Sequence, residues 1–121
     1  MKMRKLKNLS VSEIGMGCMA FSHGYGKIPE ESYSIEAIRQ AVDYGCNFFD
    51  TAEVYGPELK AEYRGHNEKI LGKALEGRRA DVVIATKLHI ATEEPKNDGS
   101  VYETLKKHLK NYLKVEMQCL N

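Results

Sequence analysis

The sequence predicts an α/β fold in which helices connect parallel strands, and three observations support this prediction. A run of apolar residues at helical spacing ends just before Gly45, which readily adopts the positive φ of a left-handed helix cap. The bulky segment at residues 47–50 follows directly and lacks helical spacing, as a strand does. Residues 81–87 are almost continuously apolar, as in strands that a parallel sheet buries on both faces. The helical run consists of Ile35, Ile38, Ala41 and Val42.

The amino-terminal elements are a hairpin and a first parallel strand. Residues 3–14 alternate weakly between apolar and polar side chains, which predicts a short hairpin. Residues 14–19 predict the strand, in which Gly15 and Gly17 allow close approach of another group to the backbone. Tight packing of the strand and contact with a cofactor both remain open, because the full dinucleotide-binding fingerprint is missing.

A glycine-rich loop at residues 20–29 separates this strand from the first helix. We expect the ring side chains of this loop to be exposed: Phe21, His23 and Tyr25. The helix is predicted over residues 30–44, since acidic residues lie near its positive end and its apolar residues form one stripe.

A second helix is predicted over residues 68–76. Asn67 is expected to cap it, and Gly77 to end it. His66 is then expected to be an exposed loop residue. The apolar residues expected to face inward are Ile70, Leu71, Ala74 and Leu75.

The remaining elements continue the alternation of strand and helix. The third parallel strand is predicted over residues 82–87. Ser100 and Glu103 match a capping box, and the apolar periodicity after them predicts a third helix over residues 101–113. Residues 115–120 predict a further strand. Such units connect parallel strands of one sheet.

Composition and charge exclude several classes of protein. The net charge is +1, from 18 basic and 17 acidic residues that are interspersed, so neither nucleic acid nor a membrane is an expected partner. The cysteines are odd in number and far apart in the sequence, which argues against a disulfide framework. The histidines do not have the spacing of metal ligands, which argues against a metal site. These residues are Cys18, Cys46, Cys119, His23, His66, His89 and His108. With no long apolar run, the protein is expected to be cytoplasmic.

Charged side chains end two successive strands of the predicted sheet. Asp50 shares a strand face with Phe48, and Lys87 shares one with Val83, so each charge follows an apolar face and needs a partner. The carboxyl ends of parallel strands meet at one edge, where α/β proteins bind ligands. Asp50, Lys87 and Tyr55 are therefore expected to converge. An ordinary ion pair beside a loop aromatic is the alternative interpretation.

Four separated motifs resemble those of aldo-keto reductases. They are IGMGCM at residues 14–19, FFDTAEVYG at 48–56, NEKILG at 67–72 and ATK at 85–87, and they occur in the family's order. The resemblance implies a TIM barrel of eight (β/α) units, a fold that needs about 250 residues. Residues 1–121 would then be one partial barrel domain of about three and a half units, with the hairpin at its amino terminus.

The same resemblance implies NADP(H)-dependent reduction of an aldehyde or ketone. Tyr55 would be the proton donor, Lys87 the cation that makes its phenol more acidic, and Asp50 the carboxylate that orients Lys87. Gly17, Cys18, Met19 and Asp50 would border the cofactor. The substrate itself is not indicated, because the family's pocket is lined by variable loops.

Two parts of the family's site have no match in this chain. The family's catalytic histidine follows the fourth strand, and such barrels bind phosphate through loops after strands 7 and 8. We therefore expect weak or no NADP(H) binding and no activity of the isolated chain, and self-association through an open sheet edge. A non-catalytic cofactor-binding or regulatory module, or an inactive truncated gene product, are the alternatives.

Overall fold

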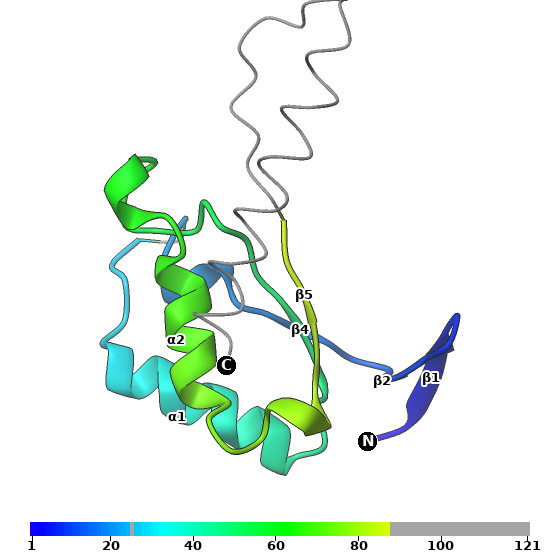
Figure 1. The fold of residues 1–121 in the computed structure, drawn as a ribbon. Coiled ribbons are helices and arrows are strands. Elements are labelled where there is room, and N and C mark those ends of the chain that lie inside the picture. The colour runs from blue at the N-terminus through cyan, green and yellow to red at the C-terminus, as the bar shows by residue number, and fades with distance from the viewer. Residues whose placement is uncertain (25, 88–121) are drawn as a thin grey trace, which may run out of the picture.

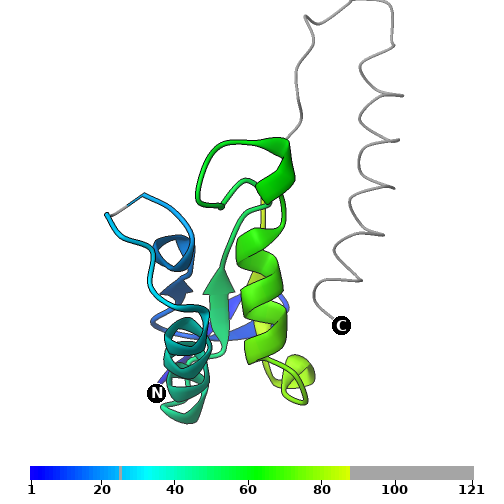
Figure 2. The same cartoon turned by 90° about the vertical axis from the view of Figure 1, so that its left-hand side faces the viewer.

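The computed structural model describes residues 1–24 and 26–87 of the 121-residue chain. Within them, an antiparallel hairpin precedes a parallel sheet that carries helices on one face, as Figures 1 and 2 show. The hairpin consists of β1 (Met3–Leu6) and β2 (Leu9–Ser12). The parallel strands are β3 (Met16–Gly17), β4 (Phe48–Asp50) and β5 (Val83–Ala85). The mixed α/β architecture and the parallel sheet are thus confirmed.

Helices α1 (Glu31–Asp43) and α2 (His66–Ala74) connect these strands. Short 3-10 helices occur at Met19–Phe21, Ala61–Tyr63 and Arg79–Asp81. Gly45 follows α1 with a φ of +86°, so the predicted left-handed turn is confirmed. It allows the chain to reverse from the helix into β4 within a few residues.

Strand register determines which side chains face the helices. In the described sheet the order is β3-β4-β5, with Met16 opposite Phe49 and Phe49 opposite Ile84. Phe49 is fully buried on the helix side. Asp50 and its partners Gly17 and Ala85 in the register therefore lie on the opposite face. The predicted alternation of faces is confirmed.

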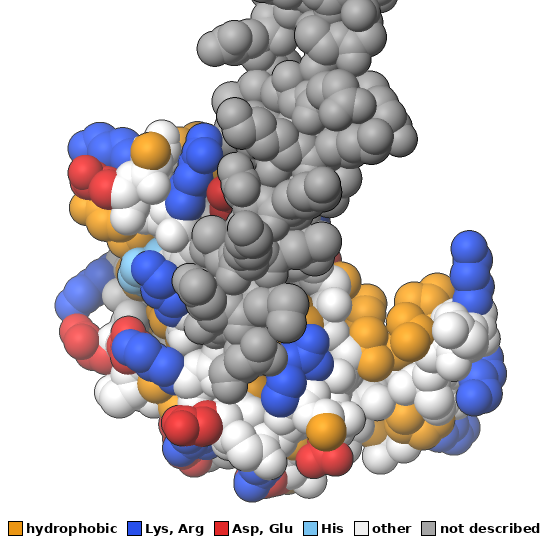
Figure 3. All heavy atoms as spheres, in the orientation of Figure 1, with side chains coloured by type: hydrophobic (Ala, Val, Ile, Leu, Met, Phe, Trp, Pro, Cys, Tyr) orange, Lys and Arg blue, Asp and Glu red, His pale blue; other side chains and the backbone are white. Residues whose placement is uncertain are grey.

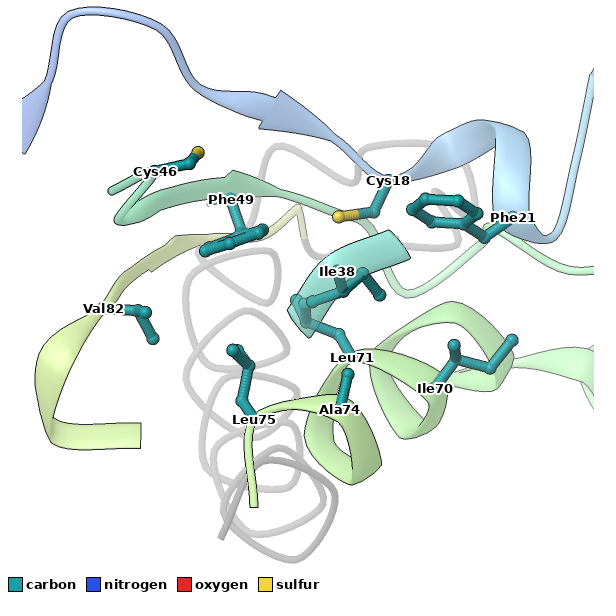
Figure 4. Packing of buried hydrophobic residues seen from close by; sticks show 10 residues of the cluster. All are labelled: Cys18, Phe21, Ile38, Cys46, Phe49, Ile70, Leu71, Ala74, Leu75 and Val82. Atoms are coloured by element: carbon teal, nitrogen blue, oxygen red, sulfur yellow. The ribbon is translucent and has the colours of Figure 1, made fainter. Parts of the chain in front are cut away.

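The core lies between the sheet and the helices (Figure 4). Phe49 extends from β4 toward α1 and α2, and the inward-facing residues predicted for α2 are all buried. We call the central part of this cluster the apolar layer: Ile38, Phe49, Leu71, Ala74 and Leu75. Ile35, Ala41 and Val42 of the predicted stripe on α1 pack against it. Burial of about 25 cal/mol per Å² makes such contacts the main source of stability.

The loop after β3 differs from the prediction. Phe21 is buried and belongs to the core cluster, so the expectation of an exposed ring was wrong. His23 is half-buried, and its Nδ1 donates to the carbonyl oxygen of Gly56 at 3.0 Å. Distant segments cover both rings, which the local glycine-rich sequence does not reveal.

Several predictions fall on residues outside the described ranges. These are the exposed Tyr25, the helix that begins at the Ser100 capping box, the strand at residues 115–120, and the remarks on His89, His108 and Cys119. Among the residues that the structure does describe, no helix is both long and apolar enough to cross a membrane.

Candidate active site

The carboxyl ends of β4 and β5 bring Asp50 and Lys87 into contact. Lys87 Nζ donates to Asp50 Oδ1 at 2.6 Å and to the carbonyl oxygen of Thr51 at 2.8 Å. The backbone continues the pairing beyond the strands, because Thr51 N–H donates to the oxygen of Ala85 and Glu53 N–H to that of Lys87. The amine is therefore held by two acceptors at the edge predicted from sequence.

Tyr55 lies beside the same amine. Lys87 Nζ is 5.1 Å from the centroid of the Tyr55 ring, within the range of cation–π attraction. The backbone of the loop that carries Tyr55 is anchored by two hydrogen bonds. The Tyr55 N–H donates to the carbonyl oxygen of Ala52, and the backbone carbonyl oxygen of Tyr55 accepts from the N–H of Asn67. Asp50, Lys87 and Tyr55 thus converge at the carboxyl end of the parallel sheet, and we call this group of three side chains the rim. All three side chains remain partly accessible to solvent.

The electrostatics of the rim centre on Lys87. Burial alone would lower the pKa of Lys87, but hydrogen bonding to Asp50 and Tyr55 and attraction to their negative charges raise it above the ordinary lysine value. The amine is consequently a stable ammonium at neutral pH. A positive charge is thus held beside the ring of Tyr55.

The residues predicted to border a cofactor differ in what they expose. Gly17 is exposed and lies opposite Asp50 in the register. Met19, the first residue of a 3-10 helix, is half-buried. The Cys18 side chain lies in the core, where burial first and the charge of Asp50 second raise the pKa of the thiol to about 12. The Cys18 thiol therefore stays protonated. The backbone N–H of Cys18 donates to the backbone carbonyl oxygen of Asp50 at 2.8 Å.

Comparison with known proteins now places this arrangement in a family. A sequence model of the aldo/keto reductase family matches residues 13–116, most of the chain. The chain belongs to the aldo/keto reductase family. This confirms the resemblance seen in the sequence motifs, and it makes the chain part of a family of oxidoreductases. Which residues perform chemistry in this chain stays a prediction.

Individual relatives support the assignment. The uncharacterized oxidoreductase YqkF of Bacillus subtilis (strain 168) is 31% identical over 116 residues, 94% of this chain and 33% of that protein. The holo form of aldo-keto reductase AKR11C1 from Bacillus halodurans superposes with a TM-score of 0.70 at 32% identity, covering 99% of this chain and 36% of that one.

A more distant neighbour shares the fold only. The aldo/keto reductase of Klebsiella pneumoniae in complex with NADP and acetate has a TM-score of 0.54 at 24% identity, covering 84% of this chain and 32% of that one. This aldo/keto reductase chain spans about a third of the length of the relatives named here.

A hollow adjoins the rim of this aldo/keto reductase chain. It has a volume of about 490 Å³ and lies between the hairpin and the helix-free face of the sheet, with Gly17, Phe48 and Asp50 in its wall. Figure 3 shows hydrophobic side chains along the projecting hairpin. The exposed large apolar residues of β1 and β2 are Met3, Leu6 and Leu9. Asp50 thus contacts Lys87 and also lines this hollow.

The two glycines of the first strand have different surroundings. A Cβ at Gly15 would lie 2.7 Å from Cδ1 of Phe48, whereas a Cβ at Gly17 would meet nothing within 4 Å. Gly15 therefore serves tight packing, and Gly17 leaves the rim open. The sequence left open whether Gly15 and Gly17 serve tight packing or contact with a cofactor. Packing explains Gly15, and contact with a cofactor stays a prediction for Gly17.

Beneath the rim lies a set of buried polar side chains that sequence reasoning missed. We call it the polar layer, and its members are at most 1% exposed: Ser22, Thr51, Asn67 and Glu68. Asn67 does not cap α2, because Gly65 is the N-cap and the Asn67 side chain bonds to distant residues. His66 is not an exposed loop residue either. It begins α2, is half-buried, and its Nδ1 lies 2.9 Å from Ser22 Oγ.

Proposed function

We propose that this chain carries the proton-transfer part of an NADP(H)-dependent reductase of aldehydes or ketones. The proposal depends on one observation: Lys87 Nζ lies 2.6 Å from Asp50 Oδ1 and 5.1 Å from the Tyr55 ring centroid. Membership of the aldo/keto reductase family supports a role for the chain in carbonyl reduction.

The roles follow from the charges. Tyr55 donates its phenolic proton to the carbonyl oxygen of the substrate as that oxygen becomes an alkoxide, so the O–H bond of the phenol breaks and that of the product alcohol forms. The Lys87 ammonium stabilises the phenolate that remains. Asp50 keeps Lys87 charged and directed, since its carboxylate accepts a charge-assisted hydrogen bond at 2.6 Å.

NADPH, when bound, supplies the hydride for this reduction. The residues at the rim fit a flat nicotinamide ring, because Gly17 presents backbone without a side chain and borders the hollow together with Asp50. Met19 is half-buried beside them, and Cys18 offers only its backbone. In support, a family member of the same fold is described in complex with NADP.

Two measurements on the purified 121-residue chain test this proposal. Nicotinamide fluorescence during titration with NADPH reports binding, which we expect to be weak, so high concentrations of NADPH and aldehyde are needed. Aldehyde-dependent loss of NADPH absorbance reports reduction. Where the original chain gives a measurable rate, Tyr55→Phe should lower it about 10²- to 10⁴-fold, because the general acid is removed while the ring is kept.

The matched control is Tyr33→Phe, which removes the hydroxyl of an exposed tyrosine on α1. We expect it to retain the rate of the unsubstituted chain. NADPH binding without reduction would overturn the role of Tyr55 and favour a cofactor-binding regulatory module. Absence of both would overturn the proposal and favour a chain without activity of its own.

A further inference from the structure

The polar layer has no role in the proton transfer described above, yet it lies directly beneath the residues that perform it. Burying a polar side chain without partners costs about 1–3 kcal/mol, and a carboxylate more. Glu68, a potential carboxylate, is only 1% exposed. Such groups are retained in a core where their hydrogen bonds fix neighbouring segments in position.

Asn67 joins the end of β4, the loop of Tyr55 and the segment after β3. The Oδ1 of Asn67 accepts a hydrogen bond from Thr51 Oγ1 at 2.6 Å. Its Nδ2 donates to the backbone carbonyl oxygen of Cys18 and to Ser22 Oγ, both at 2.8 Å. The backbone N–H of Asn67 donates to the backbone carbonyl oxygen of Tyr55 at 3.1 Å. One side chain and one amide thus set where Tyr55 lies relative to Thr51.

Thr51 connects this group to the amine. It follows Asp50 in the chain, and its carbonyl oxygen accepts from Lys87 Nζ at 2.8 Å. Any movement of Thr51 against α2 therefore moves an acceptor of Lys87 and the carboxylate before it.

Glu68 makes the corresponding connection to β5. Its Oε1 accepts from Thr86 Oγ1 at 2.6 Å, and Thr86 directly precedes Lys87. Since Asn67 and Glu68 are neighbours in the first turn of α2, the ends of β4 and β5 are attached to the same helical turn. Each attachment point is adjacent in sequence to a member of the Asp50 and Lys87 pair.

We propose that Asn67 and Glu68 are positioning residues, which hold Thr51 and Thr86 so that Lys87 stays within contact of both Asp50 and Tyr55. This inference rests on the proposed function for its catalytic consequence, although the geometry of the ion pair can be tested without it. A residue that only filled the core would affect stability and leave the charge and the kinetics at the rim unchanged.

The experiment removes one hydroxyl at constant shape. Thr86→Val deletes the donor to Glu68, and Thr86→Ser keeps it. In Thr86→Val we expect kcat for aldehyde reduction to fall about 10- to 100-fold with KM changed less than about 3-fold, as for loss of a group that orients a reacting one. Thr86→Ser should restore kcat.

A second readout does not depend on activity. The titration midpoint of Lys87 is followed by NMR of its ε-carbon, assigned by the loss of that signal in Lys87→Arg. We expect the midpoint to be raised in the original chain, to fall toward the ordinary value of about 10.4 in Thr86→Val, and to recover in Thr86→Ser. An unchanged midpoint and kcat in folded Thr86→Val would overturn the proposal.

The two proposals fail separately. If the original chain reduces no aldehyde, the proposed function fails, but a lowered Lys87 midpoint in Thr86→Val still supports the positioning role. If Thr86→Val does not fold, as judged by circular dichroism, Thr51→Val and Thr51→Ser make the same comparison from β4. There, an unchanged Lys87 midpoint in folded Thr51→Val overturns the proposal, and a lowered one supports it.

Discussion

The apolar layer packs the sheet against both α1 and α2, whereas the polar layer attaches it to α2 alone, and the two layers use different chemistry. In the apolar layer, Phe49 packs against Ile38 and Leu71, and no contact there requires a fixed angle. In the polar layer, Asn67 reaches three partners at 2.6–2.8 Å, and each bond has a required direction. The first layer supplies most of the free energy of folding, while the second determines where the strand ends lie.

This division matches the location of the candidate site. Apolar packing tolerates small displacements at moderate cost, whereas proton transfer does not tolerate a displaced donor. The directional contacts occur next to Asp50, Tyr55 and Lys87, and the apolar ones lie under the bodies of the strands. Substitutions in the two layers should therefore separate stability from the geometry of the rim.

The largest loss of stability is expected in the apolar layer. Phe49→Ala removes a ring that is 0% exposed, so the free energy of unfolding should fall by about 3–5 kcal/mol. Phe48→Ala is the matched control, because Phe48 is half-buried on the opposite face and should cost less. Urea unfolding followed by circular dichroism measures both. Equal losses would contradict the assignment of the core to one face.

An intermediate effect is expected on the helix-free face. Gly15→Ala places a Cβ 2.7 Å from Phe48 Cδ1 and 3.2 Å from the Phe48 oxygen, so stability should fall by about 1–3 kcal/mol. Gly17→Ala meets nothing within 4 Å and should change stability by less than about 0.5 kcal/mol. Thermal unfolding of both variants tests this, and a greater loss in Gly17→Ala would contradict it.

The elements of the apolar layer were predictable from sequence because their signals are local. The helix expected at residues 30–44 is observed at Glu31–Asp43, and the turn at Gly45 has the expected positive φ. Periodicity also identified the buried face of α2. Alternation along the strands placed Asp50 on the face of Phe48 and Lys87 on the face of Val83, and the parallel arrangement predicted their contact.

The polar layer was not predictable in the same way. Asn67 at the start of a helix matches the local pattern of a cap, but its partners Thr51, Ser22 and Cys18 lie 16, 45 and 49 residues away. Gly65, with a φ of +73°, takes the N-cap position instead. A signal was present in the adjacent Asn67 and Glu68, since two polar residues precede an apolar run, but their partners required the fold.

The smallest expected effect concerns the ion pair at the rim. The pKa of Lys87 is raised in the folded chain, so this pair stabilises the fold fully below the unfolded value near 10.5, and the contribution is lost as pH rises through the folded value. Because Lys87 and Asp50 are 52% and 46% exposed, the contribution is screened and should not exceed about 1 kcal/mol.

The variant Asp50→Asn tests this prediction, because it lacks a main cause of the raised pKa of Lys87. Urea unfolding at successive pH values between about 9 and 12, spanning the ordinary lysine value, should therefore show a steeper loss in the original chain than in Asp50→Asn. Other lysines and tyrosines titrate in both proteins and cancel in the difference. Parallel curves would contradict the prediction and mean that the contact between Lys87 and Asp50 adds nothing measurable to the free energy of folding.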